Sequence, residues 1–227
     1  DLFINNRNLI NYTKTHLKIC DLNRLYRRFA LSKICPNNDI PRIANINTNI
    51  TKLIQIFQNE QVQFDWIPNQ DIFNTFKEYC SSITNYFNID NCKTNNGNVF
   101  NTGIIPELDN LYETKLKYDE EFEQFRLYLS NLIQEPIYLK NTDKDGFFYE
   151  TTKKRGRKIQ EILNTDNPHN MTITNSTSNS KICSKIIKDI SDKYFALNTK
   201  IENATKKYVS DIVSKWYDKY YYSCLSF

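Results

Sequence analysis

Residues 108–132 have the sequence LDNLYETKLKYDEEFEQFRLYLSNL, in which apolar residues recur at alternating steps of three and four. This apolar stripe, with one gap at Lys115, consists of Leu108, Leu111, Tyr118, Phe122, Phe125, Leu129 and Leu132. The spacing places these side chains on one face of a helix, which at ~1.5 Å per residue is close to 40 Å long. The acidic run Asp119-Glu120-Glu121-Glu123 falls on the outer face, where solubility explains it.

A second apolar stripe lies near the end of the chain. It consists of Cys183, Ile187, Ile190, Tyr194, Leu197, Ile201, Ala204 and Tyr208. Two long stripes separated by a compact insert predict an antiparallel helical arm, out and back. The insert contains the runs Ile137-Tyr138-Leu139 and Phe147-Phe148-Tyr149 on either side of Asp145-Gly146, a hairpin turn signal.

The predicted fold is therefore mainly α, a helical bundle plus a long antiparallel arm with a small β-hairpin or sheet at its tip. The predicted divisions are residues 1–105 for the bundle, 106–135 for the outgoing helix, 136–180 for the tip and 181–227 for the returning helix. Within the bundle, Pro36 and Pro68 separate three expected helices, over residues 1–34, from residue 38 or 39 through 54, and over 72–80. Residues 88–103 and 164–180 are expected to be loops.

The composition excludes several classes of protein. The chain has 227 residues, of which 40% are hydrophobic and 25% charged, so it is neither a disordered tail nor a membrane protein. No apolar run reaches the ~18 residues of a membrane span. The four glycines form neither a dinucleotide-binding nor a P-loop string, which excludes ATP or NAD binding by those loops. The chain begins at Asp1 without a signal segment, and we expect it to be part of a longer intracellular protein.

No catalytic, metal-binding or cofactor-binding residue is predicted. His16 and Cys20 are four residues apart on an expected helix, but two ligands do not close a site, and the other histidine, His169, falls in an expected loop. The six cysteines form no C-x-x-C pair and are expected to stay reduced. We expect the C-terminal aromatic residues to form a surface that packs on something outside this chain, namely Trp216, Tyr217, Tyr220, Tyr221 and Tyr222.

The densest charge cluster is Lys153-Lys154-Arg155-Gly156-Arg157-Lys158, at the expected tip of the arm. Cations at the tip contribute little to the stability of a distant core, so a role in binding explains them better. The favoured role is contact with phosphates, which releases counterions. The predicted DNA-binding residues are Lys153, Lys154, Arg155, Arg157 and Lys158. One alternative is a coiled-coil scaffold that binds a protein partner and has a solvated basic tip. A metal-assisted nuclease is a third reading, which needs a carboxylate cluster that the pattern does not supply.

Three strings together resemble the MutS family of DNA mismatch-repair proteins. The first, Asp21-Leu22-Asn23-Arg24-Leu25 with Arg28, Leu31 and Pro36-Asn37-Asn38-Asp39, is similar to the lever-helix pattern D-[IL]-x-R-L-x-x-R followed by a proline and an aspartate. The second, Gly103-Ile104-Ile105-Pro106-Glu107-Leu108-Asp109-Asn110-Leu111, is similar to the G-x-x-x-E-L-D-x-L string that opens the outgoing clamp helix. The third, Gly146-Phe147-Phe148-Tyr149-Glu150-Thr151-Thr152-Lys153, resembles G-Y-Y-I-E-V-T-K in the clamp.

The resemblance implies a lever bundle and a clamp that closes around double-stranded DNA through backbone contacts. It also implies that the parent protein is a dimer and a DNA-dependent ATPase, which binds ATP and Mg²⁺ outside this segment. The segment itself is expected to hold no cofactor and to hydrolyse nothing. The family's ATPase and its mismatch-reading N-terminal domain are absent from the sequence. Phe76-Lys77-Glu78 and Phe148-Tyr149-Glu150 match the letters of its mismatch probe in the wrong region, so that role is not carried over. The composition, typical of an AT-rich genome, favours a viral or organellar member; the compartment (nucleus, cytoplasm, organelle or viral factory) is not assigned.

Overall fold

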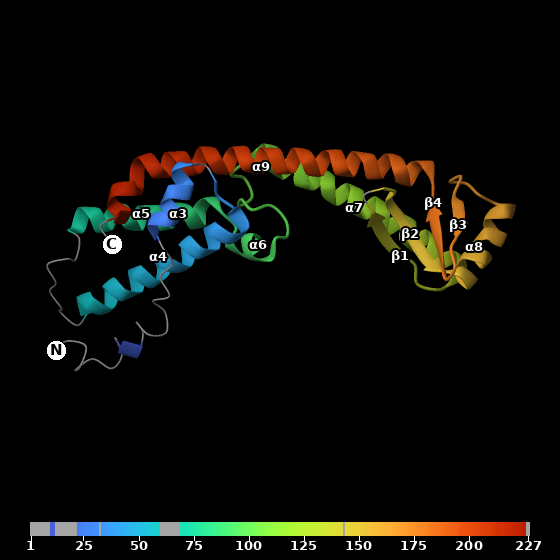
Figure 1. Ribbon diagram of the computed structural model, residues 1–227, viewed down its shortest axis with the longest axis horizontal. Coiled ribbons are helices and arrows are strands. Elements are labelled where there is room, and N and C mark those ends of the chain that lie inside the picture. The colour runs from blue at the N-terminus through green and yellow to red at the C-terminus, as the bar shows by residue number, and fades with distance from the viewer. Residues whose placement is uncertain (1–9, 12–21, 32, 60–68, 143, 226–227) are drawn as a thin grey trace. The chain divides into compact units, whose positions relative to one another are not determined.

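The computed structural model describes residues 10–11, 22–31, 33–59, 69–142 and 144–225 (Figure 1). Over these residues the protein is mainly helical (70%) with a small four-stranded antiparallel sheet, which confirms the predicted fold class at that level. The chain forms two compact units. Unit 1 comprises Asp1–Asp109 and Asn203–Phe227, and unit 2 comprises Asn110–Glu202. Helices α7 (Pro106–Ile133) and α9 (Lys185–Leu225) each contribute residues to both units.

Unit 1 is helical in the part that the structure describes. Besides the ends of α7 and α9, it contains α3 (Leu22–Ala30), α4 (Pro36–Asn59), α5 (Gln70–Tyr86) and α6 (Ile89–Thr94). Helices α4 and α5 confirm the second and third expected helices. The first expected helix, over residues 1–34, ends earlier than predicted, at Ala30, and most of its N-terminal part lies outside the described residues.

The expected loop over residues 88–103 contains α6, so that part of the prediction is wrong. The Asn88 side chain caps the helix by accepting a hydrogen bond from the Asn91 N–H at 3.0 Å. Asn95 ends it in the left-handed conformation, with φ 54°. Asparagine is a good residue at both helix ends, and an Asn-rich stretch is therefore compatible with a short helix as well as with a loop.

Two of the five C-terminal aromatic residues, Trp216 and Tyr220, belong to the core of unit 1. Trp216 and Tyr220 are both 5% exposed. The Trp216 ring lies 5.6 Å from Tyr79 and 5.7 Å from Phe87, measured between ring centroids, and Tyr220 lies 5.3 Å from Tyr79. The prediction of an outward surface is wrong for these two residues, because α5 and the residue that follows it supply the partners within the same chain. The Tyr222 side chain lies outside the described residues.

The sheet of unit 2 has the strand order β1-β2-β4-β3, with every neighbouring pair antiparallel. The strands are β1 (Tyr138–Thr142), β2 (Gly146–Thr152), β3 (Thr172–Asn175) and β4 (Asn179–Cys183), and α8 (Lys153–Thr165) follows β2. The predicted hairpin is confirmed: β1 pairs with β2, Leu139 lies opposite Tyr149, and Gly146 adopts the left-handed φ of 66° beside the turn.

Strands β3 and β4 correct two further predictions. The expected loop over residues 164–180 contains the end of α8, β3 and the start of β4. The returning helix begins at Lys185, later than the expected residue 181, because Cys183 still belongs to β4. The residues of β3, Thr-Ile-Thr-Asn, include a single apolar side chain, so hydrophobic alternation gives almost no strand signal there.

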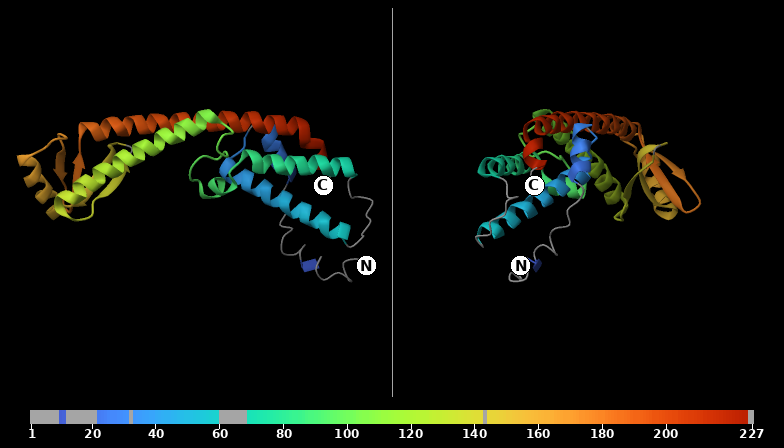
Figure 2. Two further views of the ribbon diagram at one scale, coloured as in Figure 1. Left: turned by 180° about the vertical axis from the view of Figure 1, so that it is seen from behind. Right: turned by 60° about the vertical axis from the view of Figure 1, so that its left-hand side comes forward.

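One face of the sheet is covered by helices. Tyr149 on β2 and Ile182 on β4 lie opposite each other and are fully buried. They share a hydrophobic core with Phe122 of α7, Ile159 of α8 and Ile187 of α9. Figures 1 and 2 show α7 running toward the sheet and α9 running away from it, so the two helices are antiparallel within unit 2.

Candidate nucleic-acid interface

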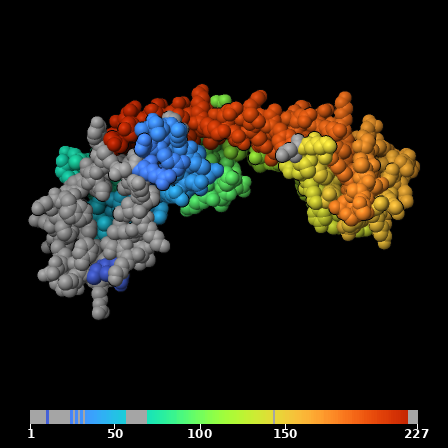
Figure 3. All heavy atoms as spheres, in the orientation of Figure 1, coloured from blue at the N-terminus to red at the C-terminus, as the bar shows by residue number. Residues whose placement is uncertain are grey.

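All five predicted DNA-binding residues lie in the first half of α8, immediately after β2. Four of them recur at positions i, i+1, i+4 and i+5, which form one face of a helix: Lys153, Lys154, Arg157 and Lys158. Gly156, Ile159 and Leu163 are buried on the opposite side. In Figure 3, α8 and the neighbouring strands form the surface at the right-hand end of the view. The cations therefore point away from the core that holds the helix.

Gly156 allows α8 to approach the sheet closely. A Cβ atom at this position would lie 2.0 Å from Ser180 Oγ and 2.2 Å from Ser180 Cβ. Both distances are far shorter than a van der Waals contact, so this strand and this helix could not come together with any larger residue there. The glycine inside the basic cluster thus sets where the cations are held.

The N-terminal turn of α8 carries positive charge where a helix disfavours it. The first turn holds no acidic residue, and the N-cap Thr152 makes no side-chain capping hydrogen bond. The Lys153 N–H donates to Ser178 O at 2.9 Å. Lys153 and Lys154 therefore add to the positive end of the helix dipole, which stabilises anions rather than cations.

Glu135 divides the five cations into two groups. Its carboxylate forms ion pairs with Arg155 and, at 3.5 Å, with Lys158. The hydrogen bond from Arg155 is the main reason that the pKa of Glu135 lies below its ordinary value. Lys153, Lys154 and Arg157 form no ion pair with any residue that the structure describes.

The position of Glu135 is fixed by the end of α7. Gln134 has a φ of 52°, in the left-handed region that ends many helices. The Glu135 N–H donates to Ser130 O at 3.2 Å, and the Ser130 hydroxyl donates to Glu135 O at 2.7 Å. Because both bonds hold the Glu135 backbone, its ion pairs with α8 are part of the local structure.

Charge is distributed unevenly within unit 2. Residues 136–184 contain eight basic and five acidic residues, whereas residues 110–133 contain three basic and five acidic ones. The acidic residues Asp119, Glu120, Glu121 and Glu123 are all exposed, as expected for the outer face of α7. Glu161 is an exposed acid one turn beyond Arg157 on α8. The cationic excess therefore lies around the sheet and α8.

The first string of family-like residues forms a partly buried ion pair in unit 1. Asp39, fully buried in the first turns of α4, lies 2.8 Å from Arg28 Nη1 of α3. Its other carboxylate oxygen accepts a hydrogen bond from the Cys35 N–H at 2.8 Å. Arg28 Nε also donates to Lys33 O at 3.1 Å. These bonds fix the connection between α3 and α4.

The second string forms the start of α7, also within unit 1. Asp109 accepts hydrogen bonds from the Gly103 N–H at 2.8 Å and from Asn98 Nδ2 at 3.0 Å. Leu108 is fully buried, and Glu107 accepts a hydrogen bond from the Tyr208 hydroxyl at 2.6 Å. This bond is the main cause of the raised pKa of Tyr208.

The third string forms β2 and the first residue of α8. The Tyr149 hydroxyl donates to Phe122 O at 2.6 Å, and burial raises the pKa of this phenol. Phe148 lies on the other face of the strand, where Lys181 Nζ is 4.2 Å from its ring centroid. The string therefore holds the sheet against α7.

The remaining candidates from the sequence form no site. His16 and Cys20 lie outside the described residues. The His169 ring packs edge-on against Phe125 and Tyr128, at 5.1 and 5.2 Å between ring centroids. Over the described ranges there is no cluster of three or more His, Cys, Asp or Glu residues suited to a metal ion.

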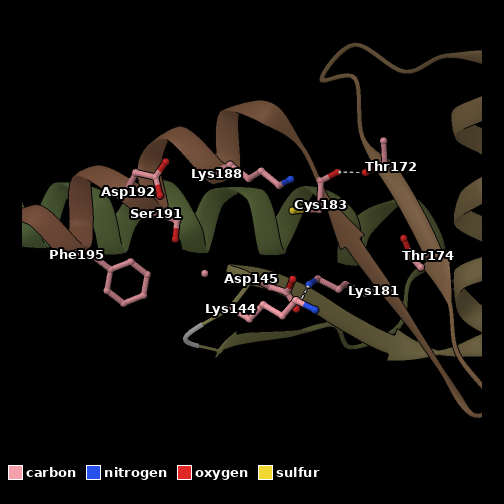
Figure 4. A pocket seen from close by; sticks show the side chains of 11 residues that line it. Lys144, Asp145, Thr172, Thr174, Lys181, Cys183, Lys188, Ser191, Asp192 and Phe195 are labelled. Atoms are coloured by element: carbon pink, nitrogen blue, oxygen red, sulfur yellow. Dashed lines mark hydrogen bonds and ion pairs between the residues drawn. The ribbon is translucent and has the colours of Figure 1, made fainter.

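Three lysines that the sequence analysis did not single out line one cavity in unit 2. They are Lys144, Lys181 and Lys188, from the β1–β2 turn, β4 and α9 (Figure 4). Because up to 44 residues separate them along the chain, no contiguous motif could reveal them.

Comparison with known proteins adds no assignment. No protein-family model matches this chain, and no curated protein is similar to it in sequence. None of the described helices is both long and apolar enough to cross a membrane.

Proposed function

We propose that this chain is the lever-and-clamp core of a MutS-like DNA mismatch-repair protein, and that it binds duplex DNA through sequence-independent contacts to the backbone. The observation that carries the proposal is the basic face of α8. Its cations point away from the core, three of them have no ion-pair partner among the described residues, and two lie at the positive end of the helix. The lysines at the positive end of the helix repel one another and the helix dipole, and an external anion relieves this repulsion. DNA phosphates supply such anions at regular spacing.

The three family-like strings support the same proposal. In two of them, residues that match the family pattern make a specific contact: Arg28 with Asp39, and Asp109 with the Gly103 N–H. In the third string, Tyr149 bonds to Phe122 O but stands where the family string has isoleucine. The contacts in the first two strings therefore support the proposal.

The proposal assigns different tasks to the two units. Unit 2 would be the clamp, and α8 would contact phosphates without reading bases, since phosphate contacts carry no direct sequence information. Unit 1 would be the lever. In the parent protein, ATP and Mg²⁺ bound outside this segment would change the position of the clamp through α7 and α9, and the parent would act as a dimer.

The coiled-coil scaffold remains the second candidate, and one observation favours it. Glu135 already pairs with Arg155 and Lys158, as expected if these cations serve only the fold of unit 2. The two candidates differ in salt dependence. Phosphate binding weakens steeply as the salt concentration rises, whereas apolar association between helices does not.

The experiment that tests the proposal is binding of a fluorescently labelled DNA duplex, followed by anisotropy over a series of salt concentrations. Three variants of the full chain are compared with the wild type. One neutralises the unpaired cations (Lys153→Gln, Lys154→Gln, Arg157→Gln), and one the pair held by Glu135 (Arg155→Gln, Lys158→Gln). The matched control neutralises three exposed lysines of α7 and α9 (Lys117→Gln, Lys193→Gln, Lys200→Gln).

We expect the first variant to flatten the slope of log Kobs against log salt by ~0.9 for each phosphate that it no longer binds. The Glu135-paired variant should change the slope less, and the control should leave it close to that of the wild type. Wild-type protein that does not bind duplex at low salt, or equal slopes for the first variant and the control, would contradict DNA binding by α8.

A further inference from the structure

The cavity lined by Lys144, Lys181 and Lys188 has a volume of about 670 Å³. It lies between the β1–β2 turn, one face of β3 and β4, and the first turns of α9 (Figure 4). Strand residues pointing into it, such as Thr174 and Lys181, lie on the face of the sheet opposite to Tyr149 and Ile182. The cavity is therefore separate from α8, which covers the other face.

The wall of the cavity is held in place by a close contact between the turn and α9. The Phe147 N–H donates to Ser191 Oγ at 3.0 Å. At Gly146, a Cβ atom would lie 2.5 Å from the same oxygen, so only glycine allows this approach. Ser191 is 2% exposed, and no acceptor for its own proton is found among the described residues. Its hydroxyl is thus oriented by the turn and retains a hydrogen-bond donor.

The lysines of the cavity differ in how their charge is balanced. Lys181 lies 2.7 Å from the Asp145 carboxylate, and its hydrogen bond lowers the pKa of that acid. Lys144 and Lys188 are exposed and form no ion pair within the described part of the chain. The Asp145 carboxylate also interacts electrostatically with Lys144, and Asp192 lines the same cavity. The three lysines still exceed the two carboxylates by one positive charge, which favours an anion with several oxygen atoms, such as a phosphate.

An aromatic ring and a carboxylate occupy the other end of the cavity. Phe195 is 40% exposed and stacks on Phe147, with ring centroids 5.5 Å apart. Figure 4 shows Phe195 at one end of the cavity and Thr174 and Lys181 at the other, with Asp192 on the same helix as Phe195. An exposed ring supported from behind is a surface on which a flat heterocycle can stack. The Asp192 carboxylate can accept hydrogen bonds from the N–H groups of such a heterocycle.

We infer that this cavity binds a nucleotide, with the phosphate between Lys144 and Lys188 and the base against Phe195. A simple inorganic anion would use the lysines alone and gain nothing from the aromatic end. The volume lies within the range of roughly 300–1,000 Å³ usual for small-molecule sites. A free mononucleotide and the terminal nucleotide of a DNA strand offer the same chemistry. The inference does not depend on the α8 interface, since neither site uses residues of the other.

The test is a titration of the full chain with a free mononucleotide such as AMP or GMP, followed by backbone amide NMR shifts of Gly146, Phe147 and Ser191. Inorganic phosphate and a 5′-phosphorylated single strand are titrated in parallel. The variants are Lys144→Gln with Lys188→Gln, Phe195→Ala, and the charge-matched control Lys117→Gln with Lys200→Gln. The altered side chains are exposed or half-exposed, and circular dichroism checks that each variant remains folded.

We expect saturable shifts at the three amides with the mononucleotide. The Lys144/Lys188 variant should bind it at least about tenfold more weakly, and the lysine control should bind like the wild type. Phe195→Ala should weaken nucleotide binding but leave binding of inorganic phosphate unchanged. Saturation by the phosphorylated strand alone, still sensitive to the two lysines, would support the site and identify a strand end as its source. No saturation by either nucleotide ligand, or no effect of the lysine variant, would overturn the inference.

Discussion

The ion pair between Arg28 and Asp39 in unit 1 and the unpaired cations of α8 lie in opposite environments. At the α3–α4 connection, Asp39 is fully buried, and both of its oxygen atoms have fixed partners in Arg28 and the Cys35 N–H. On α8, Lys154 and Arg157 are exposed or half-exposed, and the cations of the first turn oppose the helix dipole. Asp39 is desolvated and matched by geometry, as a charge that serves the fold requires, whereas Lys154 and Arg157 are left solvated, as the proposed contact with DNA requires.

This difference makes stability and binding separable. Changes at the buried contacts should alter the free energy of unfolding, whereas changes on the basic face of α8 should alter DNA binding and leave the fold intact or slightly more stable. The following predictions, in order of decreasing effect, test where that boundary lies.

The largest effect should come from Gly156→Ala, which forces α8 away from the sheet. The new Cβ would overlap Ser180, whose Oγ and Cβ lie 2.0 and 2.2 Å away, and we expect a loss of about 2–4 kcal/mol in the free energy of unfolding measured in urea. In an unconstrained helix the same change would stabilise by roughly 0.5–1 kcal/mol. Addition of Ser180→Gly should restore part of the loss, and a Gly156→Ala variant as stable as the wild type would contradict the close contact.

Removal of the arginine from the ion pair with the buried Asp39 should have the next largest effect. Arg28→Ala leaves the Asp39 carboxylate buried without its counter-charge. Because the Arg28 side chain is 39% exposed, water can partly replace it, and we expect a loss of about 1–3 kcal/mol rather than the full cost of an isolated buried charge. Arg42→Ala, at an exposed position of α4, is the control and should stay within about 0.5 kcal/mol of the wild type. Equal losses in the two variants would show that the pair contributes little.

Tyr149→Phe should destabilise unit 2 by about 1–1.5 kcal/mol. The substitution removes the hydroxyl that bonds to Phe122 O at 2.6 Å in the core. Tyr138→Phe serves as the control, since Tyr138 is 58% exposed at the start of β1. Thermal unfolding followed by circular dichroism should separate the two variants, and unchanged stability of Tyr149→Phe would mean that the hydrogen bond makes no net contribution.

Lys154→Glu should stabilise the protein slightly while it weakens DNA binding. An acid in the first turn of α8 interacts favourably with the helix dipole, which is worth about 0.3–1 kcal/mol. Lys200→Glu, in the middle of α9, makes the same change of charge without that benefit. If Lys154→Glu destabilises the protein, Lys154 has a structural role. Stability and binding are then not separable between the α3–α4 connection and α8.

The smallest effect should be the pH dependence of the Glu135 ion pairs. The pKa of Glu135 in the folded protein lies below its ordinary value of 4.5, chiefly because of Arg155, so the pairs stabilise the protein above that pH. The stabilisation is lost as the pH falls through the lowered pKa, where the folded carboxylate also takes up a proton. The difference in Tm between the wild type and Glu135→Gln should therefore be present at pH 7 and shrink below pH ~4. A difference that is the same at both pH values would place its cause outside this carboxylate.

Hydrophobic periodicity predicted the parts of the fold in which a repeated apolar face is buried. The stripe from Leu108 to Leu132 forms α7, and the turn signal Asp145-Gly146 joins two paired strands. The prediction failed where polar residues form regular structure. Helix α6 is capped by Asn88, and β3 contains only Ile173 as an apolar residue, so both elements depend on backbone hydrogen bonds and on their neighbours.

The candidate site was predicted in the same partial way. A run of cations such as Lys153 to Lys158 is visible in the sequence because its members are neighbours. The sequence does not show that Glu135 pairs with only some of these cations, since Glu135 precedes Arg155 by 20 positions. The lysines of the cavity are separated still more widely and meet only through the turn, β4 and α9.

The sequence by itself determined the helical content, the hairpin and the presence of a cationic cluster, because periodicity, turn chemistry and local charge act between near neighbours. Only the tertiary structure decided which charges are matched, which aromatic residues are buried, and that Gly156 brings α8 against Ser180. These outcomes depend on contacts between residues far apart in the chain. Such contacts form only when burial of the apolar core has fixed the elements against one another.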